Sequence, residues 1–512
     1  MNIFLKPFVK CASVCVLLYA VALPLRGAVK PSALFGDNAV LQAGVDVPVW
    51  GTARQGEVVT VEFQGRKKSV TAKDGKWMVH LRRLKPGGPF DLIIAGGDSL
   101  TFTNVLVGEV WLCSGQSNME VGLGAAHNAK EELPKATYPN LRLFVVSQST
   151  AFVPQDAVTP NPSNDLHGHW QICTPETILK DGTWPAYPGF SAVAYFFGRE
   201  LQGTTGQPVG LIGSYFGGTL VSSWMSLDAL KKNPEFTHRI SEYESAMARF
   251  KSDGSRSNEE QKNIPSVLFN AMIQPLVPYA LKGVIWYQGE QNAAAPDGYA
   301  NAFKCMVTDW RRRWGLGDFP FLFVQIAGYH APQTNASEGG WALLREQQMK
   351  SLSLRKTGMA SAMDLGAPFD VHPRDKLDVG HRLALAAKHV AYGQELVYSG
   401  PIYDSMKIQG DKIRISFRHV GGGLKVGLPP WTPSGKLPPT PTRLTGFAIA
   451  GADRNWVWAD AFIERDRVVV SSLQVRNPVA VRYGWASFPV CNLYNAEGLP
   501  ASSFRTDDWR EP

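Results

Sequence analysis

The feature that most constrains the fold is a long central region in which short apolar runs alternate with amphipathic segments. The apolar runs have the length of buried strands, and in the segments between them apolar residues recur at intervals of three and four. This alternation predicts a parallel sheet covered by helices on both faces. The predicted strands are Val110–Cys113, Leu141–Val146, Val209–Ser214, Gly283–Tyr287, Phe321–Gln325 and Ala360–Met363, and the predicted helices are Ser191–Gln202, Ala300–Trp314, Ala342–Leu354 and Lys376–Tyr392.

The regions on either side of this core lack the helical pattern. Residues 29–105 contain short alternating runs separated by Gly and Asp-Gly turns, which is typical of a small sandwich. Residues 396–512 are also β-like and include a Pro-rich loop. We therefore expect an α/β core at 106–395 between an N-terminal β-sandwich domain at 29–105 and a C-terminal β-rich domain at 396–512.

The first 28 residues predict an export signal. Lys6 and Lys10 precede an apolar run, and Gly27-Ala28 offers a small-residue cleavage site. The run is short for a membrane span, so we expect a periplasmic or secreted protein without stable membrane insertion after cleavage. Removing these residues lowers the formal charge from +8 to +5. The remaining basic residues are scattered, which argues against nucleic-acid binding.

Four cysteines remain after the predicted cleavage: Cys113, Cys173, Cys305 and Cys491. They are far apart and lack Cys-x-x-Cys spacing, so a zinc site is not expected. Export would permit disulfides, but three pairings of four cysteines are possible and the sequence does not choose among them. The oligomeric state is equally open.

The strand at Val110–Cys113 runs directly into Ser114-Gly115-Gln116-Ser117-Asn118. A serine presented at the carboxyl end of a strand in an α/β sheet has the placement of a nucleophile. Ser117 is therefore the candidate, provided that a base and an oxyanion site lie nearby.

Two other strands also end in residues suited to acyl chemistry. Gly217-Gly218 follows one strand, and backbone N–H groups at glycines can approach a developing oxyanion closely. Gln288 to Asn292 follows another strand and supplies neutral amide donors. Because carboxyl ends of parallel strands share one edge of a sheet, these residues are candidate oxyanion donors for Ser117.

His372 follows the last predicted strand and is the candidate base. An imidazole has a pKa suited to taking a proton from serine near neutral pH. Asp370 lies two residues earlier, on the same side of an extended segment, and could orient the ring. Asp364 is the reserve, and a Ser-His dyad that uses a backbone carbonyl remains an alternative.

Together these motifs resemble the SGNH hydrolases, named for Ser, Gly, Asn and His markers, and more narrowly the sialate O-acetylesterase family of carbohydrate esterases. The resemblance covers nearly the whole chain after residue 28. The matching segments are Gly115-Gln116-Ser117-Asn118-Met119, Gly217-Gly218-Thr219, Trp286-Tyr287-Gln288-Gly289-Glu290, His372-Pro373-Arg374-Asp375-Lys376 and Asn492-Leu493-Tyr494-Asn495.

This resemblance implies a flavodoxin-like sheet and a serine esterase that works through an acetyl-enzyme, without metal or organic cofactor. Ser117 would be the nucleophile, His372 the base, and Gly218 an oxyanion donor. The chain departs from the family pattern at Gln291, where serine is common, so Gln288, Gln291 or Asn292 could supply the amide; Gln288 and Asn292 are our choices. It also has Phe369 where an acid often stands three residues before the histidine.

The implied substrate is an acetylated carbohydrate, and O-acetylated sialic acid is the expectation from the family. An acetylesterase of xylan or another plant polysaccharide is the alternative, because the motifs concern the acetyl chemistry and not the sugar. A protein that only binds glycans is the alternative outside the enzymes. A sialic acid substrate predicts a basic residue near the pocket, which the sequence alone does not identify.

Overall fold

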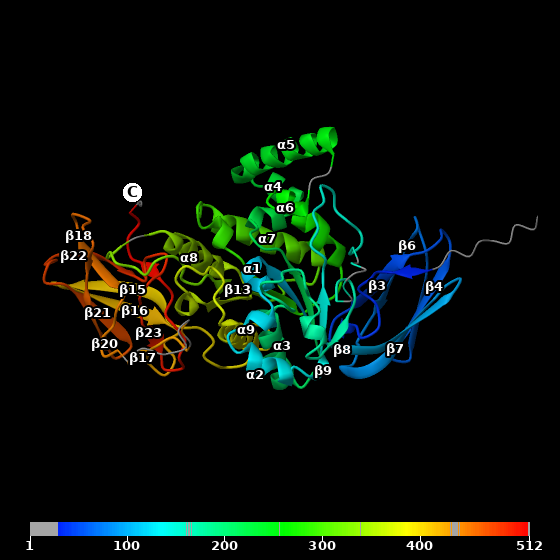
Figure 1. Ribbon diagram of the computed structural model, residues 1–512, viewed down its shortest axis with the longest axis horizontal. Coiled ribbons are helices and arrows are strands. Elements are labelled where there is room, and N and C mark those ends of the chain that lie inside the picture. Colours follow the sequence, from blue (N-terminus) through cyan, green and yellow to red (C-terminus); the bar gives the residue numbers. More distant parts are fainter. Residues whose placement is uncertain are drawn as a thin grey trace, which may run out of the picture.

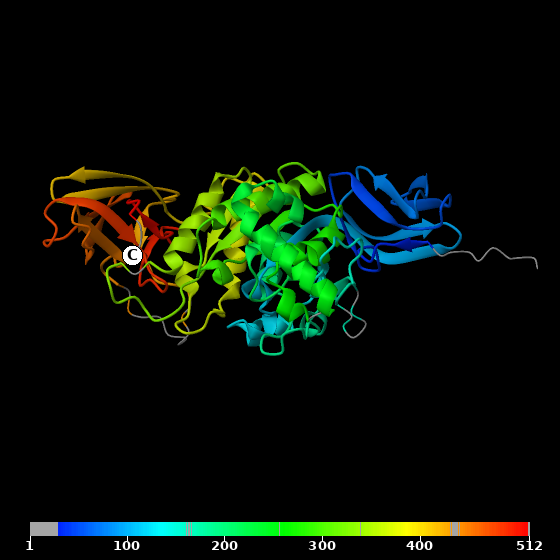
Figure 2. The same cartoon turned by 90° about the horizontal axis from the view of Figure 1, so that it is seen from above.

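The structure is a computed structural model that describes residues 29–159, 161, 164, 166–254, 257–337, 339–430, 432, 439 and 441–509. Three parts lie in a row, with an N-terminal β region at one end, an α/β core in the middle and a C-terminal β region at the other end (Figures 1 and 2). The predicted export signal at 1–28 lies outside the described residues.

The α/β core is built on a seven-strand path with the order β10-β9-β11-β8-β12-β13-β14. All neighbours are parallel except β10 and β9. The strands are β8 (Ser99–Gly115), β9 (Tyr138–Val145), β10 (Gln171–Cys173), β11 (Val209–Tyr215), β12 (Gly283–Tyr287), β13 (Phe321–Gln325) and β14 (Thr357–Ser361). The predicted parallel α/β core is confirmed.

Helices cover both faces of this sheet, which is why its strands are almost wholly apolar. α3 (Ala192–Thr205) and α9 (Lys376–Val390) pack together on one face. α7 (Tyr299–Trp314) and α8 (Trp341–Lys350) lie on the other (Figure 1). A further helix, α5 (Thr237–Asp253), projects above α7 with α4 (Leu227–Lys231) and α6 (Asn258–Gln261) beside it. α5 is not among the helices predicted from the sequence.

The order of the strands places a crevice above β8. The chain forms β8 first, continues to β9 and β11 on one side, and then crosses to β12 and β13 on the other. At such a switch point the loops leave adjacent strands in opposite directions and open a crevice at the carboxyl edge of the sheet. The loops after β8, β11 and β12 border that crevice.

The N-terminal region has a three-stranded sheet and further strands that join the core sheet; one of these, Val40–Gln42, runs parallel to β8, and the others are antiparallel to their neighbours. The first sheet has the order β1-β3-β6, and β2, β4, β5 and β7 extend from the first half of β8. Because β8 runs without interruption from Ser99 to Gly115, it crosses the expected domain boundary at 105/106. The bounds are β1 (Lys30–Pro31), β2 (Val40–Gln42), β3 (Val47–Thr52), β4 (Val58–Phe63), β5 (Arg66–Thr71), β6 (Lys76–Leu81) and β7 (Gly87–Ala95).

The C-terminal region consists of small antiparallel sheets around a separate apolar cluster that includes Ile415, Phe447, Val470 and Tyr483. Its strands are β15 (Ile402–Gln409), β16 (Lys412–Arg418), β17 (Leu424–Val426), β18 (Phe447–Gly451), β19 (Val457–Trp458), β20 (Asp460–Glu464), β21 (Arg467–Ser471), β22 (Pro478–Tyr483), β23 (Leu493–Asn495) and β24 (Phe504–Arg505).

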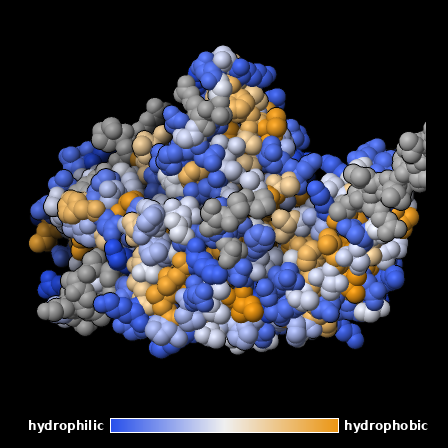
Figure 3. Space-filling view, turned by 45° about the vertical axis from the view of Figure 1, so that its right-hand side comes forward, coloured by the Kyte–Doolittle hydropathy of each residue, from blue (hydrophilic) through white to orange (hydrophobic). Residues whose placement is uncertain are grey.

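On the face shown in Figure 3, hydrophilic residues predominate and hydrophobic residues are spread among them in small groups. Within the described ranges, no helix is both long enough and apolar enough to cross a bilayer. Cys113, Cys173, Cys305 and Cys491 are free thiols, so none of the possible disulfide pairings is formed.

Candidate active site

Three strands end at the same level of the sheet and bring their loops together. Gly115 of β8 is in register with Tyr215 of β11 on one side and with Tyr287 of β12 on the other. The segments that follow are Gln116–Ser117, Gly217–Gly218 and Gln288–Asn292. The predicted meeting of these three segments at one edge is therefore confirmed.

A glycine is required where β8 turns toward the nucleophile. Gly115 has φ +138°, and a Cβ at this position would lie 2.1 Å from the backbone oxygen of Tyr287. The next N–H group, that of Gln116, donates to the same oxygen at 2.9 Å. The chain thus turns tightly against β12, and Ser117 begins the short helix α1 (Ser117–Glu120).

Ser117 and His372 form a nucleophile–base pair. The Oγ atom of Ser117 lies 2.9 Å from Nε2 of His372, although the two residues are 255 positions apart in sequence. His372 stands on the loop between β14 and α9, as predicted. Ser117 is buried among its neighbours but lines the central cavity. This geometry permits transfer of the serine proton to the imidazole.

The two candidate acids are placed differently from each other. Asp370 Oδ1 accepts a hydrogen bond from the backbone N–H of His372 at 2.9 Å, so it fixes the main chain of the histidine and not its ring. Asp364 forms a two-pronged ion pair with Arg382, with N···O distances of 2.6 and 2.9 Å. Asp364 is therefore committed to Arg382 and does not serve as the reserve.

Two aromatic rings that no sequence motif indicated pack against the imidazole. The Trp184 and Tyr187 rings lie 5.0 and 5.1 Å from the His372 ring, both in edge-on geometry. They belong to the stretch between β10 and α3. Thr183 and Trp184 of this stretch also line the cavity.

The second strand-end loop supplies the predicted glycine. Gly218 has φ +67°, a left-handed conformation that favours glycine. A Cβ here would meet Lys262 Nζ at 3.2 Å and Gln291 Oε1 at 3.9 Å. Gly217 lies against the nucleophile, because a Cβ there would be 3.3 Å from Ser117 Cβ. The glycine turn therefore borders the space in front of Ser117.

The amides of the third loop correct one prediction. Gln288 is fully buried, and its Nε2 donates to Thr219 O at 2.9 Å and to Asn292 Oδ1 at 2.7 Å. Asn292 Oδ1 also accepts from the Val221 N–H at 3.1 Å. Gln288 and Asn292 therefore brace the loop. Of the three candidate amides, Gln291 is the one that lines the cavity.

A buried polar cluster ties the nucleophile helix to the histidine loop. Asn118 Nδ2 donates to Glu290 Oε1 at 2.6 Å and to Val371 O at 2.9 Å. Lys376 Nζ donates to Asn118 Oδ1 at 2.6 Å. Burial lowers the pKa of Lys376 to about 7, against the opposing effect of the Glu290 charge. The cluster fixes Ser117 and His372 relative to each other through their chain neighbours.

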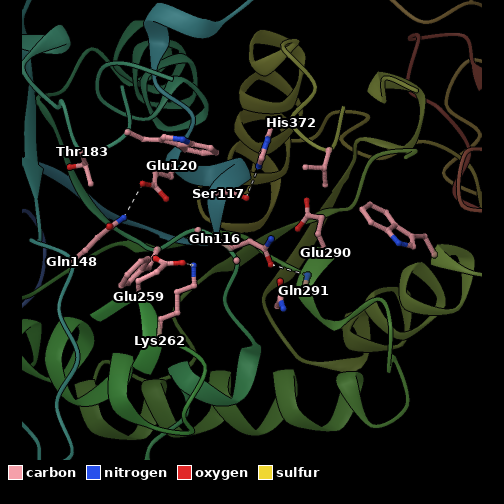
Figure 4. A pocket seen from close by; sticks show the side chains of 16 residues that line it. Gln116, Ser117, Glu120, Gln148, Thr183, Glu259, Lys262, Glu290, Gln291 and His372 are labelled. Atoms are coloured by element: carbon pink, nitrogen blue, oxygen red, sulfur yellow. Dashed lines mark hydrogen bonds and ion pairs between the residues drawn. The ribbon is translucent and has the colours of Figure 1, made fainter. Parts of the chain in front are cut away.

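The cavity in front of Ser117 has a volume of about 490 Å³, enough for a small sugar. Figure 4 shows His372 on one side of Ser117, and Glu120, Gln148, Glu259 and Lys262 on others. Gln148 follows the carboxyl end of β9, where residues of a parallel sheet border the crevice, so its place near the site could have been predicted. Lys262 follows the short helix α6, and no motif in the sequence indicated it.

Glu120 is a buried carboxyl group in the cavity wall. Its Oε1 accepts a hydrogen bond from Gln148 Nε2 at 2.9 Å. Burial raises the pKa of Glu120 to about 7, while the bond from Gln148 acts in the opposite direction. The residue is on α1 with Ser117, and its Oε2 lies near Gly217. It therefore connects the nucleophile helix to the glycine turn.

No cluster of three or more His, Cys, Asp or Glu residues that could hold a metal ion occurs in the described ranges. Near the cavity wall, His167 contacts Asp181, with Nε2 3.2 Å from Oδ1. Both residues of this pair are buried, and the Thr183 hydroxyl also donates to Asp181 Oδ1 at 2.7 Å.

Comparisons with known proteins give consistent relatives. Residues 107–389 match the family model described as carbohydrate esterase, sialic acid-specific acetylesterase. Sialate O-acetylesterase of Mus musculus is 32% identical, over 89% of this chain and 90% of its own length. The human enzyme of the same name is 31% identical, over 89% and 88%.

A solved structure shares the fold over most of this chain. A carbohydrate acetylesterase from Xanthomonas citri superposes with a TM-score of 0.80 and 38% identity, covering 94% of this chain and all of its own. The model match spans more than half of this chain, and the relatives align with most of it. This chain belongs to the sialic acid-specific acetylesterase family of carbohydrate esterases.

Proposed function

We propose that this protein removes O-acetyl groups from sialic acid, with Ser117 as nucleophile and His372 as general base. The observation that carries the proposal is the 2.9 Å contact between Ser117 Oγ and His372 Nε2 at the floor of a cavity of sugar size. The choice of sialic acid as the sugar rests on the relatives, which are sialate O-acetylesterases. The choice of ester hydrolysis as the reaction rests on the residues of the cavity.

In the proposed reaction, Ser117 Oγ attacks the acetyl carbonyl carbon while its proton passes to Nε2 of His372. The tetrahedral oxyanion is bound by the N–H groups of Ser117 and Gly218 and by the amide of Gln291. His372 then protonates the departing sugar oxygen, and the acetyl group remains on Ser117. Water, deprotonated by His372, attacks the acetyl-enzyme and releases acetate with regeneration of the serine hydroxyl.

The remaining site residues have positioning roles in this proposal. Asp370 holds the backbone of His372 and its charge favours the protonated ring, whereas Trp184 and Tyr187 fix the plane of the ring. Gln288 and Asn292 maintain the loop that presents Gln291.

The substrate assignment can be tested with purified protein that begins after residue 28. We expect acetate release from O-acetylated sialic acid with a kcat/KM well above that for acetylated xylan, measured at matched ester concentration. If acetylated xylan is preferred, the proposed mechanism stands, but the proposed substrate is wrong. Binding of glycans without release of acetate from either would contradict the proposal and favour a binding protein.

The pH dependence of activity gives a second test. Burial lowers the pKa of His372 to about 4, reinforced by the charge of Lys376 and partly opposed by Asp370. The free enzyme therefore keeps a neutral, basic imidazole at every pH above that value. We expect kcat/KM to hold between pH 7 and 5 and to fall through about 4.

The variant Glu120→Gln checks that this acid limb belongs to the histidine. The glutamine side chain of this variant cannot ionise. Any change in kcat/KM near pH 7 that arises from Glu120 should therefore disappear, while the fall in kcat/KM near pH 4 remains. If kcat/KM instead fell with a midpoint near pH 6.5 in both the wild type and Glu120→Gln, burial would not control the pKa of His372.

We also propose the domain division at 29–105, 106–395 and 396–512, with export directed by residues 1–28. The composition of each region supports this division, and the apolar run after Lys10 supports export. The continuity of β8 across residue 105 means that the first two parts share a sheet and should unfold together.

A further inference from the structure

The cavity has a single strongly basic residue among its described lining residues, and that residue is Lys262. Three carboxyl groups also line the cavity, those of Glu120, Glu259 and Glu290. A substrate anion placed beside any of these groups would be repelled while they are ionised. The position beside Lys262 is therefore the place in this cavity where a negatively charged group of the substrate is favoured.

Lys262 is held in place before any substrate arrives. It follows α6, and the ammonium lies 5.3 Å from the centre of the Phe216 ring. An ion pair with Glu259 adds a second contact. Only 15% of the Lys262 side chain is exposed, whereas Glu259 is 69% exposed. Because the partner carboxylate is largely in water, its pairing is weak and can be exchanged for a substrate carboxylate at little cost.

The position of Lys262 relative to the reacting centre is also defined. Its Nζ atom would lie 3.2 Å from a Cβ at Gly218, so it is next to the proposed oxyanion turn but belongs to a different element. In Figure 4 it points into the cavity from the side opposite His372. A sugar whose ester faces Ser117 can therefore direct a second group toward Lys262.

We propose that Lys262 binds the carboxylate of the sugar acid and so makes the cavity selective for sialic acid over neutral acetylated sugars. This inference rests on the proposed function and adds to it the residue that reads the charge of the substrate. A hydrogen bond between an ammonium and a carboxylate within a partly buried site corresponds to about a 10- to 100-fold preference in kcat/KM.

The test compares two substrates that differ only in this charge: O-acetylated sialic acid and its carboxamide, with acetate release as the readout. The measured quantity is the ratio of kcat/KM for the acid to that for the amide. In the wild type we expect this ratio to be about 10 to 100, and in Lys262→Gln we expect it to fall to near one. Lys262→Arg keeps the charge and should retain most of the preference.

Lys251→Gln is the matched control, because it removes the same charge from an exposed position on α5 and should leave the ratio at the wild-type value. If Lys262→Gln lowers kcat/KM by the same factor on both substrates, the proposal is overturned, and the Lys262 charge would act on the oxyanion of the reaction and not on the sugar carboxylate. A folded Lys262→Gln protein that keeps the wild-type kcat/KM on both substrates would also overturn it. If the wild type releases no acetate from either sugar, the proposed function fails first, and the inference with it.

Discussion

Replacement of Ser117 by alanine should lower kcat for acetate release by about 10⁴-fold or more. The variant lacks the oxygen that forms the acetyl-enzyme, and His372 then has no hydroxyl to deprotonate at 2.9 Å. The oxyanion groups and the cavity remain, so a small activity above the uncatalysed rate should persist. Steady-state assays on an O-acetylated sialic acid measure the loss, and thermal unfolding monitors the fold.

Ser114→Ala is the matched control for this prediction. Ser114 lies three residues earlier in the same segment and is fully buried, and its hydroxyl has no hydrogen-bond partner among the described residues. Loss of an unpaired buried hydroxyl costs little stability. We therefore expect near wild-type turnover in Ser114→Ala. Comparable activity of the two variants would remove Ser117 from the mechanism.

The position of the site could be predicted because sites in parallel α/β sheets lie at the carboxyl ends of the strands. Ser117, Gly218 and the Gln288–Asn292 loop each follow an apolar run, and parallel strands bring such ends to one edge. The register of Tyr215, Gly115 and Tyr287 shows the physical basis of that expectation. His372 followed the same rule at the end of the chain's last core strand.

The choice among the amides could not be predicted, because partners far away in the sequence decide it. Gln288 turns inward since Thr219 and Tyr299 bind its amide group. Gln291, two residues beyond the glycine, is left facing the cavity. All three amides have the same chemistry and nearly the same sequence position, so local sequence has no signal that separates them.

The helix α5 was missed for a different reason. Of its 17 residues only Tyr243 and Ala246 are buried, so the apolar stripe is too narrow to indicate a helix. The helix projects from the core, and its neighbour α6 leads to Lys262. Lys262 itself ends a helix of four residues, which is too short to leave a periodic pattern in the sequence.

The role of Asp364 was also unpredictable, since its partner is 18 residues away on α9. Arg382 binds both carboxylate oxygens and also donates to Ser361 O at 2.6 Å. Tyr494 from the C-terminal region donates to Asp364 Oδ2 at 3.0 Å. This cluster anchors the start of the loop that leads to His372, so it supports the site without contacting the nucleophile.

Replacement of Arg382 by methionine should therefore destabilise the protein by about 3–5 kcal/mol, because it leaves the Asp364 carboxylate buried without its cation. The two side chains are only 4% and 3% exposed, so water cannot substitute for the guanidinium. Urea unfolding of both proteins measures the difference in free energy. The control Arg239→Met removes a more exposed pair with Glu242 and should cost less than about 1 kcal/mol.

The double variant Arg382→Met with Asp364→Leu separates the loss of attraction from the burial of an unpaired charge. If the unpaired carboxylate causes most of the damage, removing it should restore a large part of the lost stability, and the double variant should be more stable than Arg382→Met alone. If Asp364 instead oriented the His372 ring, the double variant would regain stability but lose kcat by orders of magnitude. We expect turnover near that of the wild type at temperatures where the variant is folded, because Asp364 is bonded to Arg382 and Tyr494, and within the described part of the chain it makes no hydrogen bond with the histidine.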